Sequence, residues 1–147
     1  MAGYNGTPLP KKLGIKEGTT VGVLNAPNYF EFDLGELPND VDVHRTEQPA
    51  DVFLIFADSS AEAERGFNRA MTMIPPDGAI WIAWPKKSSD VEMDITEDTL
   101  RNVLLETGLV DNKVCAIDDT WSGLRFVVRE ENRADWKQAR HPELDTA

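Results

Sequence analysis

Two short, wholly apolar runs flank one amphipathic helix pattern, and this arrangement constrains the fold more than any other feature of the chain. Residues 52–57 (VFLIFA) and 79–84 (AIWIAW) have the length and composition of strands covered on both faces of a sheet. Between them, Ser59 and Glu62 form a capping box ahead of apolar residues at helical spacing. The pattern predicts a strand, a helix over residues 61–73, and a second strand.

Two more strands and a short helix are predicted before this unit. Residues 20–24 have inward-facing valines at alternate positions and end at an Asn-Ala-Pro-Asn turn. Residues 40–46 alternate apolar and polar side chains, which is typical of a half-buried or edge strand. A short helix around residues 11–13 is expected to close at Gly14.

A second helix is predicted beyond a polar loop. Thr96 can cap its N-terminus, and Gly108 is placed at its C-terminus. The apolar residues assigned to it are Ile95 and Leu100, which form a staple, and Val103 and Leu104 on the buried side.

The last predicted element is a hairpin. Residues 112–117 and 124–129 are strand-like, and the connection 118–123 leaves no room for a crossover helix, so the two strands should be antiparallel. Gly123 is expected to supply a positive φ in the turn, and Asp119 to satisfy its N–H groups.

These elements predict one α/β domain, a single three-layer Rossmann-like fold with a mostly parallel sheet and a C-terminal antiparallel hairpin. The length of 147 residues suits a single core. Residues 1–18 are assigned to an N-terminal arm with a short helix, residues 19–130 to the α/β domain, and residues 131–147 to a polar C-terminal tail.

The charge of the chain excludes several classes of function. Fifteen Lys and Arg stand against 26 Asp and Glu, for a net charge of -11, which disfavours nucleic acid as a partner. Residues 31–64 hold ten acids and one base, Arg45. No apolar run is long enough for a membrane helix and no signal sequence is recognisable, so we expect an acidic, soluble, cytoplasmic protein. The lone Cys115 and two separated histidines predict neither a disulfide framework nor a metal site.

Three parts of the chain carry a resemblance to a known family: residues 12–26, residues 75–82 and the C-terminal hairpin. Residues 12–26 are similar to the segment that leads into the first strand of class I S-adenosylmethionine-dependent methyltransferases. Residues 75–82 resemble the turn and strand after the fourth helix of that family, and the hairpin resembles its last two strands. The resemblance implies a methyltransferase-like fold.

The cofactor loop of that family is missing from the sequence. Residues 25–28 (NAPN) stand where those enzymes carry a glycine-rich turn, and the next glycine is Gly35. Pro27 also removes an N–H group that such a loop offers. Glu47 is the only acidic residue placed to accept a ribose hydroxyl. We therefore expect no cofactor binding of the usual kind, and no cofactor is identified.

A second resemblance rests on five segments, residues 4–9, 11–15, 84–87, 108–116 and 121–124. They resemble the signature segments of a small bacterial family described only as a domain of unknown function. The family implies no activity, ligand or catalytic residue that can be carried over.

Candidate ligand-binding residues follow the carboxyl ends of the predicted parallel strands, where ligands bind in open α/β sheets. They are Asn25, Asn28, Ser59, Ser60, Trp84, Lys86 and Lys87. The two lysines and the capping N–H groups favour an anion, and solubilising charge is the alternative. Trp84 offers a flat face for a ring, or forms core and turn.

Candidate partner-binding residues lie in the basic arm and the hairpin. They are Tyr4, Lys11, Lys12, Asp111, Lys113 and Trp121. Asp111 and Lys113 lie two apart in a strand, so we expect them to share one face and to bracket a polar ligand, contact a partner or form a surface charge pair. Cys115 is read as a buried, inert thiol.

Three functional hypotheses remain. The preferred one is a non-catalytic, methyltransferase-like module that binds a protein partner or a small anionic ligand at the strand ends or through its basic arm. The second is an S-adenosylmethionine- or nucleotide-dependent enzyme with an aberrant cofactor loop. The third is an oligomeric scaffold in which the arm or the hairpin docks on another subunit. No residue is assigned a catalytic role.

Overall fold

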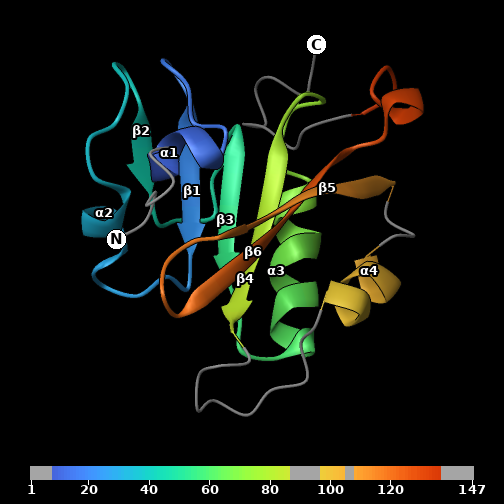
Figure 1. Ribbon diagram of the computed structural model, residues 1–147. Coiled ribbons are helices and arrows are strands. Elements are labelled where there is room, and N and C mark those ends of the chain that lie inside the picture. Colours follow the sequence, from blue (N-terminus) through green and yellow to red (C-terminus); the bar gives the residue numbers. More distant parts are fainter. Residues whose placement is uncertain (1–7, 87–96, 105–107, 137–147) are drawn as a thin grey trace.

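The computed structural model describes residues 8–86, 97–104 and 108–136, which form a six-stranded sheet with helices on both faces (Figure 1). The strands are β1 (Thr20–Leu24), β2 (Asp42–His44), β3 (Val52–Phe56), β4 (Ala79–Pro85), β5 (Leu109–Ala116) and β6 (Trp121–Val128), in the order β2-β1-β3-β4-β6-β5. β1 to β4 are mutually parallel, and β6 pairs antiparallel with both β4 and β5. The predicted Rossmann-like fold with a terminal hairpin is confirmed.

The helices are α1 (Leu9–Lys12), α2 (Phe30–Leu34), α3 (Ser60–Met71) and α4 (Glu97–Leu104), and a 3₁₀ turn spans Glu130–Asn132. α3 begins as predicted, because Ser59 Oγ accepts a hydrogen bond of 3.2 Å from the Glu62 amide. α2 was not predicted, since a helix of five residues carries only Phe30 and Leu34 on its buried face. Thr96, Ile95 and the side chains of Val103 and Leu104 lie outside the described residues.

The sheet separates two apolar layers. On one face, Phe67 of α3 and Leu100 of α4 belong to a cluster with Phe53, Ile55 and Leu124 of the sheet. The other face, beneath α1 and α2, has a second cluster that includes Leu13 and Trp81. β3 and β4 are buried along their whole length, as their continuous apolar sequences predicted.

A buried hydrogen bond holds the N-terminal segment on the sheet. Trp81 Nε1 on β4 donates to the carbonyl of Leu13 at 3.1 Å, and both residues are buried. Leu9 and Ile15 belong to the same apolar cluster. At the other end of the described chain, Trp136 Nε1 donates to the Ile74 carbonyl at 3.1 Å. Both segments therefore contribute to the packing of the domain.

The hairpin differs from its prediction in how it turns. Gly123 does not have a positive φ; it lies within β6, where an added Cβ would come within 2.9 Å of Ile117 Cδ1 and 3.1 Å of Trp81 Cε3. Close packing, rather than turn geometry, explains the glycine. The turn N–H groups of Thr120 and Trp121 donate to Asp118 Oδ1, both at 2.8 Å, and not to Asp119 as expected.

The prediction that Asp111 and Lys113 share one face is wrong. The register of β5 against β6 shifts between these residues, so that Asp111 faces Phe126 and Lys113 faces Arg125. This β-bulge inserts one residue, Asn112, and the insertion reverses the side-chain alternation. Asp111 and Lys113 consequently point to opposite sides of the sheet.

Within the described residues, no helix is long and apolar enough to cross a membrane.

Candidate functional site

A small polar pocket lies at the carboxyl ends of the parallel strands, where the fold favours ligand binding. Its volume is about 310 Å³, and it is lined by Asn25, Ala26, Phe56, Ala57, Asp58, Glu62 and Trp121. Asn25 and Ala26 follow β1, and Phe56, Ala57 and Asp58 end or follow β3, so the sheet topology assembles the pocket. We call it the edge pocket.

The polar groups of the edge pocket are hydrogen-bond acceptors more than donors. Asn25 is held in the left-handed region with φ 58°, a conformation that asparagine adopts more readily than most residues. Glu62 Oε1 accepts from the Asp58 amide at 3.2 Å, which orients its carboxylate at the start of α3. Within the described chain, the Asp58 carboxylate and the Asn25 side chain have no hydrogen-bond partner. The pocket therefore suits a cationic or donor-rich group.

Aromatic rings fill the space beside the edge pocket. Phe56, at the end of β3, packs edge-to-face against Phe30 of α2, with ring centroids 5.1 Å apart, and against Trp121, with centroids 4.9 Å apart. Such pairs add about 0.5–1.5 kcal/mol beyond the burial of their area. The row of three rings joins α2, the sheet and the hairpin, and two of the rings, Phe56 and Trp121, line the edge pocket.

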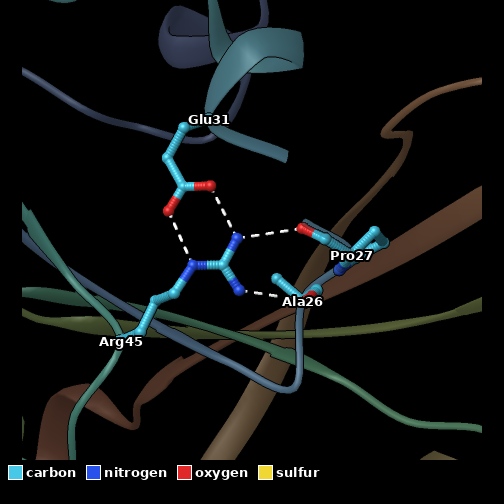
Figure 2. Close-up of polar contacts among 4 residues, drawn as sticks. All are labelled: Ala26, Pro27, Glu31 and Arg45. Carbon is cyan, nitrogen blue, oxygen red and sulfur yellow. Dashed lines mark hydrogen bonds and ion pairs between the residues drawn. The ribbon is translucent and has the colours of Figure 1, made fainter. Parts of the chain in front are cut away.

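Arg45 fixes the loop between β1 and α2 (Figure 2). Its guanidinium donates to both carboxylate oxygens of Glu31, at 2.6 and 2.7 Å, and to the carbonyls of Ala26 and Pro27, at 3.0 and 2.9 Å. The Arg45 hydrogen bond is the main cause that lowers the pKa of Glu31, and the same contact raises the pKa of Arg45. Two carbonyls of the loop therefore point toward the positively charged guanidinium of Arg45.

Glu47, the predicted acceptor for a ribose hydroxyl, is already engaged. Its carboxylate forms an ion pair with Arg69 of α3. Both side chains are about half exposed, so the pair contributes little stability, but it draws Glu47 toward α3. Arg45 was identifiable in the sequence only as the single base among ten acids in residues 31–64, and its role in the loop was not predicted.

The other predicted ligand-binding residues lie in several environments. Ser59 caps α3 and Ser60 is the first residue of that helix. Asn28 is exposed in the loop between β1 and α2 that Arg45 holds. Trp84 is buried in the core beside α3 and α4, the second of its two predicted roles. The Lys86 amide donates to the Thr120 carbonyl at 2.8 Å, and Lys87 lies outside the described residues.

The predicted partner-binding residues do not form one surface. Asp111 accepts a hydrogen bond of 2.8 Å from Arg101 of α4, and Lys113 Nζ donates to the Lys12 carbonyl at 3.1 Å. Trp121 belongs to the aromatic row. The remaining two are Lys11, which is exposed on α1, and Tyr4, which lies outside the described residues.

A larger, apolar groove lies between α1 and α2. Its volume is about 900 Å³, and its lining includes Leu9, Pro10, Ile15, Leu34 and Leu37. The ring of Phe32 borders it and is 88% exposed. The groove is larger than the edge pocket, but it has few polar groups, and none of the described residues that line it belongs to a strand or directly follows one of the parallel strands. We therefore place the candidate ligand site at the edge pocket.

Two carboxyl groups meet where α2 approaches the hairpin turn. Burial, and then a hydrogen bond shared with the Asp118 carboxyl, raise the pKa of Asp33. The Asp118 carboxylate also accepts hydrogen bonds from the amides of Thr120 and Trp121 in the turn. A change in the charge of Asp33 therefore acts on the carboxylate that holds the hairpin turn. Among the residues that the structure describes, no group of three His, Cys, Asp or Glu side chains could hold a metal ion.

Comparisons with known proteins agree with the fold. Neither models of known protein families nor curated protein sequences match the chain, so the expected link to a domain of unknown function rests on the sequence segments alone. Solved structures do match: a protein assigned as a type 11 methyltransferase from Sulfolobus solfataricus aligns over 91% of this chain and 94% of its own, with TM-score 0.57 and 14% identity.

Two further structures give the same result. DhpI in complex with SAH aligns over 81% of each chain, with TM-score 0.55 and 11% identity. A SAM-dependent methyltransferase from Aquifex aeolicus aligns over 80% of this chain and 87% of its own, with TM-score 0.51 and 15% identity. The methyltransferase-like fold, expected from the sequence resemblance, is confirmed at the level of the fold.

The residues of the edge do not fit an S-adenosylmethionine site of the usual form. Pro27 offers no N–H, and the carbonyls of Ala26 and Pro27 accept hydrogen bonds from Arg45. Glu47 is paired with Arg69. The volume of about 310 Å³ is also at the lower limit of pockets that enclose small molecules.

Proposed function

We propose that this chain is a methyltransferase-like binding module that acts through its edge pocket without using S-adenosylmethionine. The observation that carries the proposal is the Arg45 clamp on the loop between β1 and α2. A loop that holds a nucleotide cofactor presents its N–H groups to the ligand. In this chain the loop instead presents two carbonyls to the guanidinium of Arg45. The same guanidinium forms a bidentate ion pair with Glu31.

The chemistry of the edge pocket supports a ligand with a positive charge or several hydrogen-bond donors. Asp58 and Glu62 line the pocket, and none of its lining residues is basic. The negative charge of the whole chain adds to this preference. A small anion, the ligand class expected from Lys86 and Lys87, is less well matched to these carboxylates. A lysine or arginine side chain of a partner protein, or a small amine, has the right chemistry.

The second candidate function is an S-adenosylmethionine-dependent enzyme with a nonstandard loop. Asn25 supports it, because its φ of 58° gives the end of β1 the backbone conformation that a glycine would otherwise provide. The position of the edge pocket at the carboxyl ends of β1 and β3 supports it as well.

A thermal-denaturation panel separates the two candidates. The wild-type chain and the Asp58→Asn variant are heated with S-adenosylmethionine, S-adenosylhomocysteine, spermidine and arginine amide. The proposal predicts no shift with the adenosyl compounds and a saturable rise in Tm with at least one amine that Asp58→Asn diminishes. A saturable rise with either adenosyl compound would support the enzyme and overturn the proposal, and so would equal amine shifts in both chains.

A further inference from the structure

An exposed aromatic ring borders the apolar groove between α1 and α2. Phe32 is 88% exposed, although it stands in the middle of α2, where Phe30 and Leu34 are both buried. Tyr29, three residues earlier and therefore on the same side of the turn, is 48% exposed. The Phe32 ring adds little to the core of its own chain. Large apolar side chains that gather in one exposed place mark protein interaction surfaces.

The groove beside this ring is part of a fixed structure. Leu9, Ile15 and Leu34 line it, and all three belong to the buried cluster beneath α1 and α2. The segment that follows α1 is held on the sheet by the hydrogen bond from Trp81 to the Leu13 carbonyl. The groove, with a volume of about 900 Å³, is therefore preformed, so binding in it does not carry the cost of ordering its walls.

The two walls of the groove carry opposite charges. On the α1 side, Lys11 is the charged side chain among the described residues that line the groove. On the α2 side, the charged lining residues are Asp33 and Glu36. Lys11 and Glu36 are both exposed, and neither forms an ion pair with another described residue. One wall is thus basic and the other acidic.

This distribution of charge selects among the possible occupants. A purely basic partner would be repelled by Lys11, and a purely acidic one by Asp33 and Glu36. A second copy of the chain carries both signs, and a two-fold axis sets the basic wall of each copy against the acidic wall of the other. The net charge of -11 opposes association of two copies in any orientation that does not set bases against acids.

We propose that the groove between α1 and α2 is a docking site for a second copy of this chain. Each copy inserts its Phe32 ring into the groove of the other, and Lys11 of each copy faces Glu36 of the other at the rim. Aromatic anchors that fill preformed pockets carry much of the binding energy of protein interfaces. The groove and the edge pocket share no described lining residue, so the inference does not depend on the function proposed above.

Sedimentation velocity of the full chain tests the proposal, at constant ionic strength and at concentrations from low micromolar to several hundred micromolar. The wild type should pass from monomer to dimer as its concentration rises. Phe32→Ser should weaken the dimer at least about tenfold, because it removes the anchor from both grooves. Val114→Ser is the matched control, since Val114 is 45% exposed and lies on β5, which contributes no described residue to the groove.

Reversal of charge tests the orientation of the two copies. Lys11→Glu and Glu36→Lys should each dimerise more weakly than the wild type, because each brings like charges together at two places. An equal mixture of the two variants should form a heterodimer, since every contact between positions 11 and 36 then joins a Glu to a Lys. The melting of each variant at a concentration where the wild type is a monomer verifies that the chain is folded.

Each outcome bears on the proposal. A dimer that Phe32→Ser weakens and Val114→Ser leaves intact supports it, and so does a mixture of the charge variants that associates more tightly than either variant alone. A wild type that stays monomeric at every concentration would leave the groove to another occupant, and would overturn the proposal. A dimer of equal strength in Phe32→Ser and the wild type would overturn it as well, as would a mixture that associates no better than its components.

Discussion

Gly123→Ala is the substitution whose effect follows most directly from the packing. The added Cβ would lie 2.9 Å from Ile117 Cδ1, 3.3 Å from Ile117 Cγ1 and 3.1 Å from Trp81 Cε3. Ile117 and Trp81 are both fully buried, and Trp81 is held by its hydrogen bond to Leu13. Neither side chain can move away without disturbing the apolar cluster beneath α1.

Overpacking of this kind costs about 1–3 kcal/mol. The entropy of unfolding is about 2.1 cal/mol/K per residue, so for 147 residues a loss of 1 kcal/mol lowers Tm by roughly 3 °C. Gly123→Ala should therefore lower Tm by roughly 3 to 10 °C, and Gly123→Val by more. No unfavourable φ contributes, because Gly123 does not have a positive φ.

A double variant identifies the cause of the loss. Ile117→Val removes Cδ1, the atom nearest to the new Cβ, and alone costs about 0.5–1.5 kcal/mol. The loss of stability in the Gly123→Ala/Ile117→Val double variant should be smaller than the sum of the losses in the two single variants, as expected for residues in contact. Calorimetric or circular-dichroism melts of the four proteins suffice. An unchanged Tm for Gly123→Ala, or strictly additive losses, would refute the packing explanation.

Three further predictions concern the face under α1 and α2. Trp81→Phe leaves the buried Leu13 carbonyl without a donor at a cost of about 1–3 kcal/mol, so its Tm should fall by several degrees; an unchanged Tm would mean that the bond does not hold α1. Because the pKa of Asp33 is raised in the folded chain, the contribution of Asp33 to folding stability is most favourable below pH 3.8, the pKa of aspartate in the unfolded chain. This contribution is lost as the pH rises through the pKa of Asp33 in the folded chain. Asp33→Asn should therefore raise Tm relative to the wild type more at pH 7 than at pH 3.5, and a gain confined to acid pH would contradict the pairing with Asp118. Phe32→Ser should shift Tm by less than about 2 °C, because the ring is 88% exposed; a larger loss would show that the ring packs in solution.

The parts of the fold that could be predicted are those fixed by local pattern and burial. β3, α3 and β4 follow from two apolar runs and one N-cap, because strands buried on both faces need continuous apolar sequence. The class of fold followed from that unit and the terminal hairpin. α2 escaped prediction, because two buried residues in five do not make a helical period.

The errors arose where tertiary contacts decide between two local explanations. A glycine in a hairpin is compatible with a positive φ or with a close neighbour, and only the positions of Trp81 and Ile117 distinguish the two. The bulge at Asn112 likewise leaves no mark in the sequence, yet it sends Asp111 and Lys113 to opposite faces.

At the candidate site, sequence reasoning found the position but not the arrangement. The absence of glycine from residues 25–28 was visible, and the strand ends indicated the correct edge. The clamp was not visible, because Arg45 is 18 residues from Pro27 and 14 from Glu31 along the chain. The parallel pairing of β1 with β2 brings these residues together.

The most direct test of the account is an isothermal titration of the wild-type chain with S-adenosylhomocysteine at pH 7, with a class I methyltransferase as the positive control. The Arg45 clamp holds the loop carbonyls in the place of ligand-binding N–H groups, so we predict no saturable heat at concentrations that saturate the control. A dissociation constant in the micromolar range would show that the clamped loop admits the cofactor, and would contradict the account.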